Sequence, residues 1–172
     1  MLALLSLQCG GNAADISAVS PILLKMGKQV IHCGGHGSGQ AAKLANNIVL
    51  AISMAAVSEG LAFGMRNGLD SKVLSSIFNT SSAHCWSSEK YNPVPGVMDG
   101  VPSSRDYKGG FSTSLMLKDL KLALGAGEFC KANMPLTEIC NDLYQGVADL
   151  GGGSLDFSAV YRYIYERSDF NK

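Results

Sequence analysis

The sequence lacks an excess of charge of either sign, and it lacks the paired cysteines of a metal site. Lysine plus arginine and aspartate plus glutamate each total 14, so no net field attracts nucleic acid or an anionic membrane. The cysteines number five and contain no C-x-x-C pair, which argues against disulfides and zinc. We expect no metal, nucleic acid or membrane partner. We expect reduced, mostly buried thiols at Cys9, Cys33, Cys85, Cys130 and Cys140.

Targeting and membrane signals are also missing from the pattern. The opening MLALLSL carries no basic residues, and a signal peptide needs a basic segment before its apolar run. We therefore interpret it as a strand. The most apolar stretch, IVLAISMAAV at residues 48–57, is too short to span a bilayer. Asn46, Asn47 and Glu59 bracket it, so it predicts a buried helix of a soluble protein.

What is present divides into a short βαβ part and a longer helical part. Apolar runs, turn residues and helical spacing predict two strands and six helices. In the helices over 71–79 and 135–150, the apolar stripes are Val73, Leu74, Ile77 and Phe78, and Leu136, Ile139, Leu143 and Val147. The expected elements are strand 2–9, helix 14–27, strand 28–33 and helices 40–67, 71–79, 112–132, 135–150 and 157–168. The fold class is therefore mainly α, with a βαβ unit too small to bury a parallel sheet by itself.

Glycines at the start of the long helix raise the question of a cofactor loop. Gly37, Gly39 and Ala42 fit G-x-G-x-x-A after the strand-like KQVIHC. A dinucleotide fingerprint also needs a short helix and a second strand with an acid about twenty residues on. The nearest acid, Glu59, falls inside the long predicted helix. We therefore interpret these glycines as an imitation of the fingerprint.

Lys43 is the candidate catalytic residue on local grounds. Ser38 is a plausible N-cap, which places Lys43 in the first two turns, where the helix dipole disfavours a further positive charge. Such a lysine suits a general acid or base. Asn46 and Asn47 lie three and four residues on and project from the same side, so the three groups could hold a small oxygen-rich substrate. An ordinary surface lysine beside two solvated amides explains the spacing equally well.

The segment 80–111 joins two predicted helices and is unusually long for a loop in a compact domain. It contains three prolines, two tyrosines and the only tryptophan, Trp86, and this aromatic content argues for order. His84 beside Cys85 could suggest a nucleophile pair. Neighbouring residues point in different directions, so we favour a packed thiol next to a solvated imidazole.

Three segments together resemble the β-hydroxyacid dehydrogenase family: GSGQAAKLANN at 37–47, CWSSEKYNPVPGVMDGVPSSRDYKGGF at 85–111 and FSTSLMLKDLKLAL at 111–124. The likeness covers essentially the whole chain, and the Trp-to-Phe loop is typical of the branch that acts on 3-hydroxyisobutyrate. It implies a Rossmann domain followed by a helical domain that begins with a long helix. It also implies NAD-dependent oxidation of 3-hydroxyisobutyrate to methylmalonate semialdehyde, a step of valine catabolism.

The resemblance assigns roles to individual residues. The family's catalytic lysine falls on Lys43 and its substrate-binding asparagine on Asn47. The lysine that reaches the cofactor falls on Lys118, with Phe111 at the approach to the nicotinamide. We expect Asn46 and Gly39 to join Asn47 in binding the substrate. Without the resemblance, Lys118 would be a helix-surface lysine beside an aspartate.

The family's nucleotide fingerprint should precede residue 1. We therefore expect residues 1–35 to be a remnant of the NAD-binding domain and residues 36–172 to be a helical domain for substrate binding and dimerisation. On this expectation the chain alone cannot catalyse the oxidation, because it lacks the nucleotide-binding loop. It would be a fragment, an isoform or a truncated product. The alternative is an inactive helical oligomerisation module derived from the same family. A homo-oligomer, dimer or tetramer, and a mitochondrial location are implied by resemblance; no targeting segment is visible.

Overall fold

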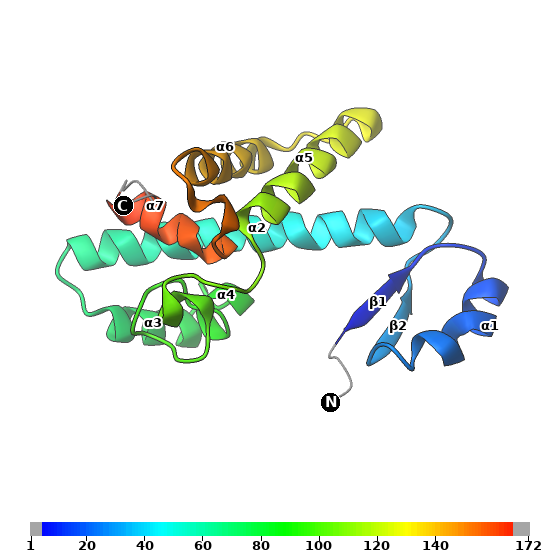
Figure 1. The fold of residues 1–172 in the computed structure, drawn as a ribbon, viewed down its shortest axis with the longest axis horizontal. Coiled ribbons are helices and arrows are strands. Elements are labelled where there is room, and N and C mark those ends of the chain that lie inside the picture. Colours follow the sequence, from blue (N-terminus) through cyan, green and yellow to red (C-terminus); the bar gives the residue numbers. More distant parts are fainter. Residues whose placement is uncertain (1–4, 167–172) are drawn as a thin grey trace. The chain divides into compact units, whose positions relative to one another are not determined.

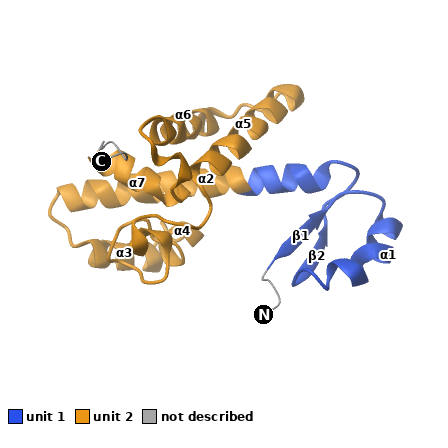
Figure 2. Ribbon diagram, viewed as in Figure 1, with its two compact units in different colours: residues 1–46 blue, residues 47–172 orange. Residues whose placement is uncertain are grey.

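A computed structural model describes residues 5–166 of the chain (Figure 1). Contacts divide it into two compact units, residues 1–46 and residues 47–172 (Figure 2). The elements are β1 (Ser6–Cys9), α1 (Ala13–Leu23), β2 (Gln29–His32), α2 (Ser38–Arg66), α3 (Ser71–Thr80), α4 (Trp86–Glu89), α5 (Thr113–Cys130), α6 (Pro135–Asp149) and α7 (Val160–Glu166), with the short 3-10 helices η1 (Pro102–Arg105), η2 (Gly152–Ser154) and η3 (Phe157–Ala159). The predicted class, mainly helical behind one βαβ unit, is confirmed. Residues 2–4 of the predicted first strand and 167–168 of the predicted last helix lie outside the described residues.

The first unit is the βαβ unit plus the beginning of α2. Strands β1 and β2 pair in parallel, with Ser6 opposite Gln29. The Asn12 side chain caps α1 by accepting from the backbone N–H of Ala14 at 2.9 Å. Helix α1 ends at Leu23, earlier than the predicted end at Gly27. The chain turns between these residues, and Gly27 packs so tightly that an added Cβ would lie 2.7 Å from the carbonyl oxygen of Leu5.

Large apolar side chains of this unit remain open to solvent. No residue of α1 is buried, and two parallel strands cannot cover an apolar helix face and their own two faces together. The exposed side chains on and around α1 and β2 are Val19, Ile22, Leu24, Met26 and Ile31.

Helix α2 runs unbroken for 29 residues, close to the predicted 40–67. The expected N-cap role of Ser38 is wrong in detail. Ser38 is the first helical residue, and its hydroxyl donates to the carbonyl oxygen of Gly35 at 2.7 Å. Gly37 precedes it with φ of +86°, a conformation that glycine adopts without strain.

By length and composition, α2 could cross a membrane, with a mean hydropathy of 1.8 in its most apolar window. The core helix of a folded domain passes the same test, and 44% of that window is buried inside the chain. The prediction from the stretch 48–57 that this segment is too short to span therefore underestimates the helix. Its packing is that of a core helix: Met54 and Leu61 are fully buried, although Val49 and Phe63 are exposed.

The second unit builds its core around the later turns of α2. One cluster joins α2 with α5, α6 and the η3–α7 segment, and a second joins the end of α2 with α3 and α7. The largest fully buried apolar side chains are Met54, Leu61, Tyr107, Met116, Leu120, Tyr144, Val147, Phe157 and Val160.

The predicted apolar stripes of α3 and α6 are partly right. On α3, Leu74 is buried and Phe78 packs against the core, but Val73 and Ile77 are about half exposed. On α6, Val147 is buried and Leu143 packs against the core, but Leu136 and Ile139 are exposed. Thr137, Cys140 and Tyr144 complete the buried face of α6.

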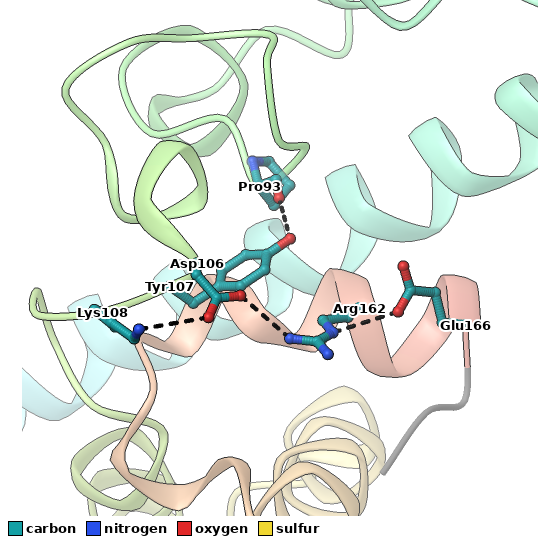
Figure 3. Close-up of polar contacts among 6 residues, drawn as sticks. All are labelled: Pro93, Asp106, Tyr107, Lys108, Arg162 and Glu166. Carbon is teal, nitrogen blue, oxygen red and sulfur yellow. Dashed lines mark hydrogen bonds and ion pairs between the residues drawn. The ribbon is translucent and has the colours of Figure 1, made fainter. Parts of the chain in front are cut away.

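The segment 80–111 is ordered, as its aromatic content predicts. Tyr107 is 2% exposed, and its hydroxyl donates to the carbonyl oxygen of Pro93 at 2.8 Å (Figure 3). Burial raises the pKa of this phenol well above its usual range. Beside it, Arg162 of α7 pairs with Asp106 at 3.4 Å, and Lys108 lies 3.8 Å from the other oxygen of Asp106. The segment is thus fastened at its end to α7.

Candidate functional site

Three polar side chains meet between α2 and α5. The amide nitrogen of Asn47 donates to Oδ2 of Asp119 at 2.6 Å, and Nζ of Lys118 lies 2.9 Å from Oδ1 of the same carboxylate. Asn47 is 2% exposed and Asp119 8% exposed. The Lys118 side chain is 59% exposed, so its ammonium group reaches solvent while remaining paired. One carboxylate therefore orients an amide and an ammonium group at once.

Asp119 is the member of this cluster that sequence reasoning missed. In the sequence it is only the residue after Lys118. Its position on the helix could have predicted its burial. Asp119 lies three residues after Met116 and four before Ala123, and these three residues share the buried face of α5. An acid on a buried face needs a partner, and Asn47 provides it.

The other predicted residues of α2 lie in its first turns. Lys43 and Asn46 are both exposed and belong to the first unit, whereas Asn47 begins the second. The continuous helix α2 carries all three. Their roles in catalysis and substrate binding stay predictions.

Gly39 has a packing reason to be glycine. An added Cβ would lie 2.6 Å from the carbonyl oxygen of Gln8 and 3.0 Å from the nitrogen of Gly10. The end of β1 thus approaches the first turn of α2 at backbone distance, and Gly10 is equally tight against Gly39. The helix that follows is 29 residues long, with no strand after it among residues 67–166. This geometry agrees with the interpretation of G-x-G-x-x-A as an imitation of the fingerprint.

A shallow hollow of about 390 Å³ lies along α5 at Lys118. Its lining combines an apolar floor with two ammonium groups and a hydroxyl: Leu117, Leu122, Lys118, Lys121 and Ser114. Phe111, half-buried, packs against the main core just before this helix.

The cysteines differ from the expectation of mostly buried thiols. All five are free, but only Cys140 is buried, Cys130 is exposed and the others are half-buried. Next to Cys85, the exposed His84 imidazole lies 3.2 Å from a carboxylate oxygen of Glu89. Hydrogen bonds from Lys90 and then from His84 lower the pKa of Glu89. The imidazole is solvated, as favoured above.

Helices packed along the later turns of α2 make up the second unit, and a βαβ unit precedes α2 in the chain. The family model described as the NAD-binding domain of NADP-dependent 3-hydroxyisobutyrate dehydrogenase matches residues 37–164. The chain belongs to this family.

Individual relatives agree with the family model. The mitochondrial 3-hydroxyisobutyrate dehydrogenase of Drosophila melanogaster is 48% identical over 92% of this chain and 49% of its own length. The rat enzyme, also named mitochondrial, is 46% identical over 96% of this chain and 50% of its own. The solved 3-hydroxyisobutyrate dehydrogenase of Mycobacterium tuberculosis, with L-serine, superposes with a TM-score of 0.88 at 37% identity, covering 92% of this chain and 54% of that one. The chain thus spans about half the length of the relatives it matches.

Proposed function

We propose that this chain supplies the catalytic and substrate-binding part of an NAD-dependent 3-hydroxyisobutyrate dehydrogenase, which forms methylmalonate semialdehyde. The observation that carries the proposal is the cluster of Asn47, Asp119 and Lys118, in which one buried carboxylate orients two residues with expected roles at substrate and cofactor. The names of the relatives support the substrate class. Their mitochondrial names support the same location here.

The domain assignment follows from this proposal. Residues 1–35 are the end of the nucleotide-binding domain, and residues 36–172 are the helical domain. The exposed apolar side chains around α1 and β2 support it, because a larger parallel sheet would cover them.

The chain's own residues divide the chemistry between them. NAD, which Lys118 and Phe111 would hold, would supply the acceptor for the hydride of the carbinol carbon. Oxidation of the carbinol also requires its hydroxyl oxygen to lose a proton, and Lys43 is the residue proposed to take that proton. Asn47 holds the substrate from one turn further along α2, and Asn46 and Gly39 are the other proposed substrate-binding residues. Asp119 accepts a hydrogen bond from the amide nitrogen of Asn47 and so fixes the orientation of that side chain.

The cofactor contacts are Lys118 and Phe111. The Lys118 ammonium group stays paired with Asp119, so its charge is partly compensated and it serves as a hydrogen-bond donor to ribose or amide oxygens. Phe111 offers a ring edge or face to the nicotinamide.

The experiment is an activity assay of the protein expressed from its whole coding sequence, which we call the natural-length protein. Purified protein is mixed with 3-hydroxyisobutyrate and NAD or NADP, and the absorbance of reduced nicotinamide is followed. We expect NAD-dependent turnover that disappears with an unbranched alcohol lacking the carboxylate. No turnover of 3-hydroxyisobutyrate with either cofactor would reject the proposal.

The second candidate is an inactive helical oligomerisation module of the same family. Large exposed apolar side chains in the second unit favour it, with Phe63 72% and Phe129 91% exposed. A protein that self-associates and shows no turnover in this assay would be this module.

A further inference from the structure

Asp156 is a buried carboxylate for which the proposed chemistry has no use. It is 0% exposed and accepts four hydrogen bonds. Its Oδ2 accepts from the Tyr91 hydroxyl at 3.0 Å and from the backbone N–H of Phe111 at 2.8 Å. Its Oδ1 accepts from the N–H and hydroxyl of Ser158 at 3.0 and 2.6 Å. A buried charge is tolerated only with such complete pairing.

The two oxygens of Asp156 accept hydrogen bonds from different parts of the chain. Oδ1 makes a local cap of η3, two residues along the chain. Oδ2 instead joins segments 65 and 45 residues away, Tyr91 in the long loop and Phe111 ahead of α5. The backbone reinforces this second tie, because the N–H of Phe157 donates to the carbonyl oxygen of Phe111 at 2.8 Å.

Oδ2 sits at the edge of an aromatic cluster formed by Trp86, Tyr91, Phe111 and Phe157. Tyr91 stacks on Trp86 with ring centroids 4.6 Å apart and on Phe157 at 5.7 Å. Phe111 meets Phe157 edge to face at 6.1 Å. Burial raises the pKa of the Tyr91 phenol far above its usual range, with the Asp156 charge as a second cause, so this phenol stays protonated and donates.

The hydrogen bonds to Oδ2 of Asp156 require a glycine at position 110. Gly110 has φ of +77°, and an added Cβ would collide with Oδ2 of Asp156 and with the Tyr91 hydroxyl. The backbone at Phe111 therefore approaches the carboxylate as closely as a hydrogen bond permits, and Phe111 has little freedom to move away.

We propose that Asp156 is a positioning residue: through Oδ2 it holds Phe111 and Tyr91 in the arrangement from which the Phe111 ring meets the nicotinamide. The inference rests on the proposed function, since it deepens the role of Phe111 there. Asp156 touches neither substrate nor cofactor; it acts through Phe111. Loss of the tie therefore weakens cofactor binding more than it slows the chemical step.

The test compares Asp156→Asn with Ser158→Ala in the natural-length protein. Asp156→Asn removes the negative charge and leaves one acceptor oxygen for four donors. We expect the KM for NAD to rise about tenfold while kcat changes less than about threefold. Ser158→Ala removes a hydrogen bond to Oδ1 only. We expect it to lower Tm without changing the KM for NAD.

A third variant keeps the test decisive if Asp156→Asn does not fold. Tyr91→Phe retains the stacked ring and removes one donor to Oδ2; we expect a KM for NAD raised about threefold and a changed emission of Trp86, the only tryptophan. An unchanged KM in folded Asp156→Asn or in Tyr91→Phe, or an equal rise in Ser158→Ala, overturns the positioning role alone. An inactive unsubstituted protein overturns the proposed function and this role with it.

Discussion

At the scale of single residues, the carboxylate of Asp119 decides how two proposed site residues are held. Its oxygens are shared between the Asn47 amide and the Lys118 ammonium group. Hydrogen bonds to a charged group contribute more to stability than neutral ones, and a partner left unpaired in a buried place is costly. The cluster thus links folding of the helical unit to the geometry of the proposed site.

Asp119→Ala should lower the free energy of unfolding by about 1 to 3 kcal/mol, because Asn47 would lose a charged partner while 2% exposed. Urea unfolding followed by circular dichroism measures the change. Asp142→Ala, an exposed acid on α6, is the matched control and should stay within about 0.5 kcal/mol. Equal losses in the two variants would contradict the buried role of Asp119.

Lys43→Ala should lower kcat in the natural-length protein roughly a hundredfold or more, with a smaller change in KM, as expected for an acid–base group that acts in the transition state. Lys43→Arg should not restore activity, because a guanidinium group keeps its proton at working pH. Steady-state kinetics of the two variants check both statements. A near-normal kcat in either variant would show that Lys43 is an ordinary surface lysine.

Cys140 should be the last of the cysteines to react with iodoacetamide. Burial raises the pKa of its thiol to about 11, so the reactive thiolate is scarce until the pH approaches that value. At pH 8 we expect exposed Cys130 to be labelled first, with Cys140 labelled only on unfolding. Peptide mass spectrometry of timed samples reports each site, and early labelling of Cys140 would show that its burial is wrong.

At the scale of elements, the order and type of the two strands and six longer helices were predictable from the sequence. The short helix α4 and the 3-10 helices were not predicted, and neither were the contacts between elements. Helical spacing and Pro135 at the first turn located α6. Its buried face was predicted only in part: Leu143 and Val147 pack in the core as expected, whereas Leu136 and Ile139 are exposed. Thr137 and Tyr144 enter the core in their place. Spacing shows which residues share a face, but another element decides which face is covered.

For the segment 80–111 too, local order could be predicted from the sequence but a distant contact could not. Its order was predictable from its aromatic side chains, Trp86 among them. Its tie to Asp156 was not, because Asp156 lies 65 residues beyond Tyr91 and reads locally as a helix cap.

Gly110→Ala should destabilise the chain by more than Gly100→Ala. Both glycines have a positive φ, +77° and +78°, so each substitution costs about 1 kcal/mol or more in backbone strain. Only at Gly110 would the new Cβ also strike Asp156 and the Tyr91 hydroxyl, whereas nothing lies within 4 Å at Gly100. Thermal unfolding of the two variants gives the comparison. A Tm for Gly110→Ala at or above that of Gly100→Ala would contradict the close approach.

At the scale of the whole molecule, the apolar surface argues for self-association. The sequence of α2 is apolar around most of its circumference, which predicts burial nearly everywhere, and the shorter helices are too few to cover it within one chain. Within one chain, Val49 is 67% and Phe63 72% exposed, so the expected burial is incomplete. Phe63 also borders a hollow of about 310 Å³ that Ile164 and Tyr165 help to line. An exposed aromatic ring beside a hollow on the same surface suits two-fold pairing, in which each copy offers both features.

We therefore expect light scattering on the purified chain at micromolar concentration to give at least twice the monomer mass of 18.1 kDa. Val49→Ser with Phe63→Ser should shift the mass to the monomer, because both changes remove apolar area from the exposed side of α2. Phe129→Ser is the matched control: its ring is 91% exposed at the end of α5, so removing it should leave the pairing intact if α2 carries the contact. A monodisperse monomer in the unsubstituted chain would refute self-association. If Phe129→Ser alone gave a monomer, the contact between copies would be assigned to α5 and not to α2.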